Sequence, residues 1–282
     1  MDYEWKLDED ARKFAEENLK ETEEKRTRFV AEIRSWYDEN PEINGCRDAD
    51  AIVPFLRGCK FDLERAKIKL RNYYKMRQET PQWFANRDPE LEEIQELVNL
   101  GVFVPMRKLH ENRLVVIIKT AAHDPGKHKQ DDVFKAGKMI LDVAAKEQES
   151  AQIYGVTAIF DMTGVSLGHA RQLPPKVIKK AVFAWQNYHC RPKQLEFVNA
   201  PLYINVVLNV FKSFMSEKLK GRVRVHFKGQ ESLHQVIDKE VLPEEYGGTD
   251  GPLSEHITYW RDKLIEYKDW FKYDEQFKSK LD

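Results

Sequence analysis

The sequence predicts a mixed α/β protein in which an all-helical N-terminal unit precedes an α/β domain. Up to about residue 98, apolar residues recur at helical spacing, and capping residues and prolines mark the helix ends. Beyond that point, short β-branched runs alternate with helical segments, which is the order expected of a mostly parallel sheet. We therefore predict three parts: a helical unit at 1–98, an α/β domain at 99–250, and a helical tail at 251–282 packed on that domain.

Four helices are expected in the N-terminal unit. They are Asp8 to Glu39, Ala49 to Arg57, a helix that follows Asp62, and Glu90 to Val98. The first contains i,i+4 pairs of acidic and basic side chains, and it ends at Asn40-Pro41 because the residue before a proline avoids helical geometry. Asp62 is a typical N-cap residue, and Thr80-Pro81 ends the helix that it begins.

Five short apolar runs are expected to form the sheet. They are Val102 to Val104, Arg113 to Lys119, Tyr154 to Phe160, Leu195 to Val198 and Val223 to Phe227. Helices are expected at Val133 to Ala151, after Pro174-Pro175, after Pro201, and at Ser254 to about Lys272. Proline suits the first turn of a helix, since its missing N–H would have no partner there. The pattern predicts a roughly five-stranded, mostly parallel sheet with connecting helices.

The most apolar helix of the chain is predicted at 202–215. Its polar residues form one narrow stripe; they are Asn205, Asn209, Lys212, Ser213 and Ser216. A surface helix normally has a wider polar face, so this helix needs apolar neighbours on two sides. Two interpretations follow: a buried core helix, or a lid with one face on a hydrophobic cargo and another able to meet a membrane. The segment is too short to cross a bilayer.

Basic residues flank the 202–215 helix. Arg191 and Lys193 precede it, and Lys218 and Arg222 follow it. If the two ends of the helix come close at the sheet edge, these four side chains form one positive patch that can hold phosphates. The alternative is a set of separate surface charges, and the pattern does not decide between the two.

The composition restricts the class of function. Charged residues are 33% of the 282, but they balance to a net charge of −1, which argues against a nucleic-acid-binding protein. Cys46, Cys59 and Cys190 are far apart and fit neither a disulfide framework nor a metal-ligand spacing, so we expect no metal and no cofactor. The acidic N-terminus does not resemble a signal peptide, and no apolar run reaches transmembrane length. We expect a cytoplasmic protein.

One segment matches a hydrolase motif. Residues 164–168 read G-x-S-x-G around Ser166, after a predicted strand and before a predicted helix, as in a nucleophile elbow. Asp238 and His256 follow in the chain order of an acid and a base. No HGGG-like oxyanion segment lies upstream. We therefore predict that the protein is not an enzyme, and a serine hydrolase acting on lipid esters remains an alternative.

Two polar pairs lie in otherwise apolar segments. His189 and Cys190 are adjacent, but neighbouring side chains on an extended chain point apart, and no carboxylate that would orient the histidine is evident. We interpret Cys190 as a packed residue beside a basic loop. Lys138 and Asp142 are four residues apart on a predicted helix, and we interpret them as a surface ion pair in preference to a ligand-facing polar pair.

Several segments resemble the CRAL-TRIO (Sec14-like) family. In the N-terminal unit, Phe55 to Asp62 is similar to the family's FLRAR-F-D segment, and Asn72 to Arg77 to its following helix. In the α/β domain, three marker segments match in order: Ile159 to Gly164, Phe197 to Pro201 and Leu242 to Gly248. The resemblance covers about residues 10–270 and is closest to the members that bind tocopherol or retinaldehyde.

This resemblance implies an α/β bowl whose sheet floors a hydrophobic pocket, with a mobile gate from Asn199 to about Arg222. The ligand-binding residues of pocket and gate are then expected to be Phe134, Ile140, Tyr154, Ile159, Phe160, Val182, Val206, Val207, Val210, Phe211 and Phe214. The phosphoinositide-binding cleft of the family maps onto Arg191, Lys193, Lys218 and Arg222. The second arginine of the family's FLRAR segment is Cys59 in this chain.

The predicted function is a non-enzymatic carrier of a tocopherol- or retinoid-like lipid. It is expected to move this lipid between membranes and to associate transiently with an anionic, phosphoinositide-containing surface. A phospholipid-exchange protein of the Sec14 type is the alternative within the family. A filled interior beneath residues 202–215 would contradict the carrier.

Overall fold

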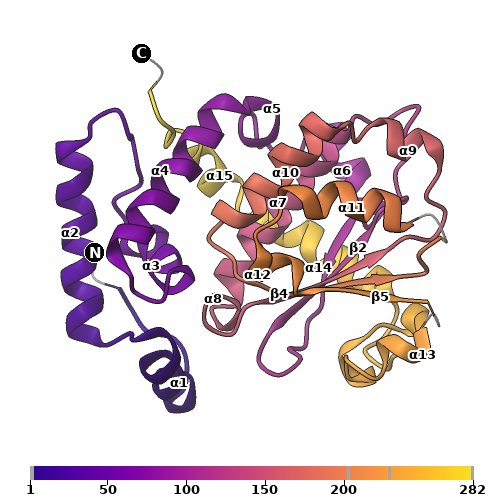
Figure 1. Ribbon diagram of the computed structural model, residues 1–282, viewed down its shortest axis with the longest axis horizontal. Helices are drawn as coiled ribbons and strands as arrows, with labels where there is room; N and C mark the ends of the chain where they lie inside the picture. The colour runs from indigo at the N-terminus through magenta and orange to yellow at the C-terminus, as the bar shows by residue number, and fades with distance from the viewer. Residues whose placement is uncertain (1–2, 202–203, 228–229, 281–282) are drawn as a thin grey trace.

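The computed structural model describes residues 3–201, 204–227 and 230–280 (Figure 1). Leu202 and Tyr203, which we predicted as the first residues of the most apolar helix, lie outside the described residues. Among the described residues, no helix combines the length and apolar character needed to cross a membrane.

The sheet has five strands in the order in which they occur along the chain. They are β1 (Phe103–Pro105), β2 (Leu114–Lys119), β3 (Val156–Asp161), β4 (Pro192–Val198) and β5 (Val223–His226). β1 is antiparallel to β2, and the other neighbours are parallel. Each strand overlaps one of the five predicted runs, so the predicted mixed α/β class with a mostly parallel sheet is confirmed.

The helices that connect the parallel strands lie on one face of the sheet. α7 (Gln130–Glu147) and α8 (Ser150–Ile153) link β2 to β3, and α9 (Leu167–Arg171) and α10 (Pro175–Asn187) link β3 to β4. α11 (Ile204–Phe214) and α12 (Glu217–Lys220) link β4 to β5. Right-handed crossovers that advance in one direction across a sheet leave their helices on the same side (Figure 1).

The opposite face is covered by the segments that follow the sheet. They are α13 (Gln230–Leu233) and the 3-10 turns η1 (Lys239–Val241) and η2 (Glu244–Tyr246). The last two helices continue from there: α14 (Leu253–Glu266) packs on the edge strand β1 and on α7, and α15 (Lys268–Asp274) lies beside α7. The Tyr246 hydroxyl donates a hydrogen bond to Asp161 at the end of β3 (2.7 Å), and Trp260 Nε1 donates to the Pro105 carbonyl (2.6 Å). The C-terminal segment therefore packs directly on the sheet.

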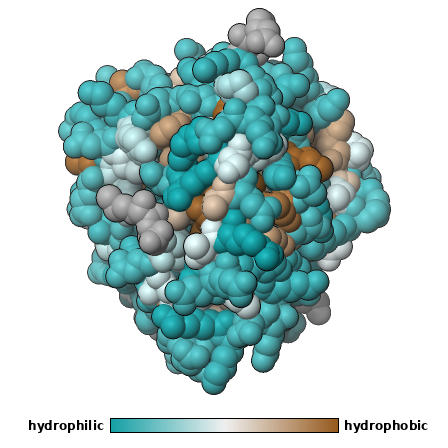
Figure 2. Space-filling model, turned by 90° about the vertical axis from the view of Figure 1, so that its left-hand side faces the viewer, coloured by the Kyte–Doolittle hydropathy of each residue, from teal (hydrophilic) through white to brown (hydrophobic). Residues whose placement is uncertain are grey.

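Six helices precede the sheet; the first four form one side of the molecule, and the last two pack on α7 (Figure 1). They are α1 (Glu9–Leu19), α2 (Glu23–Glu39), α3 (Ala49–Gly58), α4 (Leu63–Glu79), α5 (Pro81–Phe84) and α6 (Glu92–Asn99). As predicted, the Asp62 side chain caps α4 by accepting from the backbone N–H of Arg65 (3.1 Å). Figure 2 shows this side as a largely hydrophilic surface with small hydrophobic areas.

The prediction of one continuous helix from Asp8 to Glu39 is wrong. Lys20 adopts a left-handed conformation (φ 63°) that ends α1. The chain turn places the buried Glu21 carboxylate against Arg57, whose guanidinium donates to both of its oxygens (2.8 and 2.9 Å). Arg57 also donates to Glu149 (2.9 Å) and Gln152 (2.8 Å), next to and within α8. This fully buried arginine thus joins the N-terminal helices to the α/β domain.

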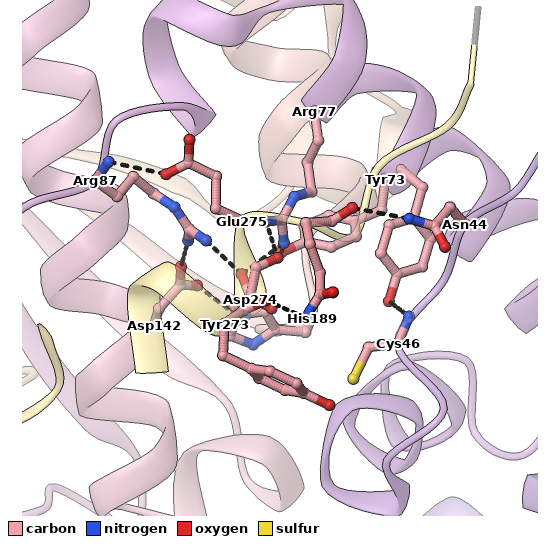
Figure 3. A network of polar contacts seen from close by, with 12 residues as sticks. Asn44, Cys46, Tyr73, Arg77, Arg87, Asp142, His189, Tyr273, Asp274 and Glu275 are labelled. Carbon is pink, nitrogen blue, oxygen red and sulfur yellow. Dashed lines mark hydrogen bonds and ion pairs between the residues drawn. The ribbon is translucent and has the colours of Figure 1, made fainter. Parts of the chain in front are cut away.

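A second polar network joins all three predicted parts of the chain (Figure 3). Arg87, after α5, forms ion pairs with Asp142 on α7 (3.2 Å) and with Asp274 at the end of α15 (2.5 Å). Arg77 on α4 also pairs with Asp274 (2.7 Å). The ion pairs are well buried, so removal of one partner would leave an uncompensated charge.

Candidate functional site

A cavity of about 240 Å³ lies between the sheet and the crossover helices. Its floor comes from alternate residues of three strands, and its walls come from α7, α10 and α11. Apolar side chains around it include Val116, Ile118, Ala158, Phe160, Leu195, Phe197, Leu141, Trp185, Leu208 and Leu219. Ligand pockets are typically concave, apolar and furnished with few polar groups, which describes this cavity.

A larger hollow of about 420 Å³ lies between α3, α4, α7 and α15, beside the network of Figure 3. Its wall contains many charged side chains, among them Asp48, Asp142, Lys146 and Asp274. An apolar molecule gains little from such surroundings, because charged groups lose hydration when it covers them. The candidate site is therefore the smaller, apolar cavity.

Four of the predicted ligand-binding residues line this cavity. Phe134 comes from α7, Phe160 from β3, and Val207 and Phe211 from α11. The Phe160 ring stacks on Phe197 with centroids 4.6 Å apart, and the Phe211 ring stacks on Trp185 at 6.0 Å. The Phe160 ring also lies 5.8 Å from Trp185, so a chain of aromatic contacts connects the floor of the cavity to α11.

Four other predicted residues do not line the cavity. Ile159 lies on the opposite face of β3, since successive strand residues alternate between faces and Phe160 is on the cavity face. Ile140 packs in the main core on another side of α7, and Val182 is fully buried in a separate cluster. Tyr154 packs against Phe14 of α1, with ring centroids 4.4 Å apart.

The remaining predicted positions belong to α11 and do not line the cavity. Val210 and Phe214 are half-buried against the apolar cluster beneath α11, whereas Val206 is 69% exposed. Of the predicted polar stripe, Asn205, Asn209, Ser213 and Ser216 are exposed, and Lys212 is partly so. α11 thus covers the cavity with one face and presents both polar and apolar groups to solvent with the rest.

The predicted surface ion pair of Lys138 and Asp142 is wrong. Both side chains are buried, and Lys138 lines the cavity. Asp142 instead accepts hydrogen bonds from Tyr188, from His189 (2.8 Å) and from Arg87 (3.2 Å). Although burial opposes ionisation of Asp142, its pKa is below the usual value because His189, Arg87 and Tyr188 stabilise the carboxylate.

The structure brings the four predicted basic residues together at one sheet edge. Arg191 and Lys193 stand at the start of β4, and Arg222 directly precedes β5 and donates to the Pro192 carbonyl. Burial, with repulsion from Arg191 and Arg222, lowers the pKa of Lys193 to about 8. Burial and the same two arginines also lower the pKa of Lys218. Within the described ranges, none of the four forms an ion pair with a carboxylate.

Three further basic residues join this cluster that sequence reasoning missed: Lys60, Arg65 and Lys69. Arg65 and Lys69 are on α4, and Lys69 Nζ lies 3.1 Å from the point that a Cβ on Gly58 would occupy. Both lie close enough to Cys59 to act on its pKa, although burial dominates and raises it. Arg65 and Lys69 of α4 therefore supply positive charge near position 59, where the family has an arginine and this chain has Cys59. We refer to Lys60, Arg65, Lys69, Arg191, Lys193, Lys218 and Arg222 as the basic cluster.

The structure does not assemble the hydrolase triad suggested by chain order. Ser166 caps α9, with its hydroxyl 2.8 Å from His169 Nδ1, and the other ring nitrogen of His169 contacts a backbone carbonyl. Asp238 instead lies beside His110 (3.2 Å), and His256 contacts the Asp250 carbonyl (3.0 Å).

The expectation that no carboxylate orients His189 is wrong. His189 Nε2 contacts Asp142 (2.8 Å), and His189 Nδ1 lies 3.4 Å from Cys190 Sγ. Burial opposes protonation of His189, but Cys190 and Asp142 outweigh it and raise its pKa to about 10. The imidazole is thus already protonated at neutral pH and has no free base to offer the thiol. As predicted, Cys190 is a packed residue beside the basic cluster.

Comparison with known proteins gives the family. Residues 100–248 match the model of the CRAL/TRIO domain, and residues 22–94 match a Pinta-like UBA domain. An alpha-tocopherol transfer protein-like protein of Mus musculus is 30% identical over 254 residues, which is 88% of this chain and 72% of that protein. Clavesin-1 of Xenopus laevis is 29% identical over 249 residues, which is 86% of this chain and 74% of that protein.

The solved structure of Sfh5 superimposes with a TM-score of 0.51 at 18% identity, and covers 93% of this chain and 99% of its own. At that identity the likeness concerns the fold alone. The domain match spans the five strands and the cavity on the sheet, and the relatives extend the similarity over most of the chain. The chain belongs to the CRAL/TRIO domain family of lipid-binding and lipid-transfer proteins.

Proposed function

We propose that this protein carries a small hydrophobic molecule between membranes and encloses it in the cavity beneath α11. The observation that carries the proposal is an apolar hollow in the place where the interior would otherwise be filled. A lipid with several hundred Å² of apolar area gains on the order of 10 kcal/mol from leaving water, before the costs of binding. A protein cavity that replaces the bilayer as solvent therefore removes the main obstacle to its transfer.

The segment from Asn199 to Arg222 is proposed as the gate. Val207, Leu208 and Phe211 of α11 cover the cavity, so the cargo can enter only if this helix moves or its side chains rearrange. Large apolar side chains are exposed on the helices of this face: Val206 on α11 (69%) and Phe183 on the adjacent α10 (41%). Such exposure suits contact with the membrane interface.

The basic cluster is proposed to bind the phosphates of phosphoinositides in that membrane. Its side chains repel one another and lack carboxylate partners in the described part of the chain, so a polyanionic headgroup would relieve the repulsion. The cluster joins the end of the gate segment to the starts of β4 and β5. Headgroup binding could therefore bias the gate, provided that the open and closed states differ in affinity.

Tocopherol-like and retinoid-like molecules are the proposed cargo classes, in keeping with the alpha-tocopherol transfer protein-like relative and the mostly apolar lining of the cavity. The proposed division is a helical unit at 1–98, the lipid-binding domain at 99–250 and a tail at 251–282. The protein would act without catalysis, in the cytoplasm, and associate with membranes only transiently.

Native mass spectrometry of the purified protein tests the proposal most directly, because a bound lipid adds its own mass. We expect one small hydrophobic molecule per chain. A phospholipid mass would instead favour a phospholipid-exchange protein. If a fluorophosphonate probe labelled Ser166 and the label disappeared in Ser166→Ala, the hydrolase would replace the carrier.

Gate variants test the transfer step. Phe211→Asp and Phe214→Asp place a charge on the covered side of α11, and we expect each to slow lipid transfer between vesicles by about tenfold or more, which corresponds to about 1.4 kcal/mol. Asn209→Asp adds the same charge on the exposed side and is the matched control. Normal binding and transfer by both phenylalanine variants would refute the gate.

A further inference from the structure

Lys138 is an unusual residue in the wall of the cavity. Residues 134, 137, 138 and 141 form one stripe of α7, and all four line the cavity. Phe134, Gly137 and Leu141 provide the apolar surface that a lipid cavity needs. Lys138 instead brings an ammonium group into this stripe, with only 8% of the residue exposed.

The ammonium of Lys138 has aromatic neighbours but no ionic partner. Its Nζ lies 5.4 Å from the ring centroid of Trp83, 5.3 Å from that of Phe84 and 5.2 Å from that of Tyr188. Lys138 Nζ makes no hydrogen bond or ion pair within residues 3–201, 204–227 and 230–280. The three rings hold the cation in place through cation–π attraction, and they leave its N–H groups without acceptors.

The nearest carboxylate is already occupied. Asp142 attracts Lys138 electrostatically, but its oxygens accept hydrogen bonds from Tyr188, His189 and Arg87. His189 and Arg87 are both positively charged and both contact Asp142, so the Asp142 carboxylate is neutralised without Lys138. The ammonium therefore adds a positive charge that the surrounding protein does not balance.

The rest of the cavity wall, as far as the structure describes it, adds no negative charge. Its titratable side chains include Lys119, His123 and His169, and no aspartate or glutamate occurs among the described lining residues. An amine would be repelled by such a cavity. A neutral alcohol or ester would leave the ammonium buried without a counter-charge, whereas a carboxylate would supply both charge and hydrogen-bond acceptors.

We propose that Lys138 binds the head group of the cargo and that the preferred cargo is a lipid carboxylic acid. This inference rests on the proposed carrier function and narrows it from hydrophobic molecules in general to acids. The carboxylate meets Lys138 beside Tyr188, which also lines the cavity, and the apolar tail extends along the sheet toward Phe160 and Phe211. A hydrogen bond to a charged group in such a place favours the acid about 10- to 100-fold over the matched alcohol.

The protonation state of Lys138 suits this role. Burial lowers its pKa to about 8, against attraction by Asp142 and Cys190, so the amine is mainly charged at neutral pH. The groups that face it are Asp142 on its own helix, Tyr188 and Cys190 after α10, and, beyond Asp142, the charged Arg87 and His189. Since a bound carboxylate favours the charged amine, acid binding should weaken only above pH 8.

Three ligands with one tail test the proposal on the full-length, delipidated protein. Dodecanoic acid, dodecanol and methyl dodecanoate are compared by equilibrium dialysis at pH 7. The wild type should bind the acid at least about tenfold more tightly than the alcohol or the ester. Lys138→Met should remove that preference and retain the binding of the neutral ligands, because methionine keeps an unbranched apolar stem.

The control is Lys135→Met, which lies on the same helix, is also 8% exposed, and does not line the cavity. It should leave the preference for the acid intact. Lys138→Arg keeps the charge and should retain a preference for the acid. If Lys138→Met fails to fold, the pH dependence of binding by the wild type still tests the inference. Binding of the acid must fall as the pH rises above 8, while binding of the alcohol stays constant.

The outcomes separate this inference from the carrier itself. If the alcohol or the ester binds as tightly as the acid, or if Lys138→Met keeps the preference for the acid, the inference is refuted and the carrier stands. If none of the three ligands binds, the proposed function fails as well.

Discussion

A phenylalanine at position 158 should fill the cavity from its floor. Ala158 lies on β3 between Val116 and Leu195 in the sheet, and all three side chains face the cavity. A phenyl ring is the size of benzene, which a cavity of about 150 Å³ can hold in another protein. The ring in Ala158→Phe would therefore occupy up to about six-tenths of the 240 Å³ cavity.

The substitution should change stability and ligand binding in opposite directions. An empty cavity costs about 24 cal/mol per Å³, so 240 Å³ costs at most about 6 kcal/mol. Burial of the new ring recovers about 1.5–3 kcal/mol of this. For a chain of this size, each kcal/mol raises the melting temperature by about 2–4 °C. The ligand-free variant should thus melt several degrees higher than the wild type, while its lipid affinity falls by about tenfold or more.

Differential scanning calorimetry of delipidated protein and a lipid-binding titration measure the two effects. Ala184→Phe is the contrasting control, because Ala184 is fully buried and does not line the cavity. There the ring overpacks a filled interior and should cost about 1–3 kcal/mol. A lower melting temperature of Ala158→Phe together with unchanged lipid binding would refute the argument, since it would mean that no usable void lies above the sheet.

Three further predictions concern single residues. Arg57→Met should lower the free energy of unfolding by about 3–5 kcal/mol, because it removes the guanidinium that two buried carboxylates, Glu21 and Glu149, share. Urea denaturation measures this, and a loss below about 1 kcal/mol would contradict it. Lys20→Gly should raise the free energy of unfolding by about 1 kcal/mol, because glycine adopts the left-handed conformation without the penalty of a side chain; a destabilised variant in the same assay would show that the lysine side chain matters more than the strain. The binding of phosphoinositide vesicles should weaken as the pH rises above 8, since Lys193, with a pKa of about 8, attracts phosphate only when protonated. Lys193→Arg should abolish this pH dependence in vesicle co-sedimentation. If the pH dependence persists in this variant, Lys193 is excluded as the titrating group.

The regular parts of the fold could be predicted because their signals are local. β-branched runs identified all five strands, and Asp62 identified a helix start by its side chain alone. The helical spacing of 23–39 was also read correctly, but the break at Lys20 was not. Lysine is rare in the left-handed region, and the break positions Glu21 for its contact with Arg57, 36 residues further along the chain.

The candidate site was harder to predict because its members meet only in three dimensions. Which face of α7 lines the cavity depends on the packing of α5 and α6 against the same helix, so Ile140 was chosen and Lys138 was not. The partners of Asp142 come from two other segments, and no spacing in the sequence connects them. The sequence did offer one signal, which was Lys138 in an otherwise apolar helix. We placed Lys138 at the surface because buried charges are usually costly.

The position of the basic cluster follows from the topology and links it to the gate. β4 and β5 are parallel neighbours, so their first residues share one edge of the sheet, and Arg191 and Arg222 necessarily meet there. The chain between these strands leaves β4 at the opposite edge and must return across the cavity, which α11 does. A headgroup bound to the basic cluster at this edge therefore contacts Arg222, where the segment that returns over the cavity ends. If those contacts differ between the open and the closed gate, membrane recognition and cargo release are coupled without any additional element.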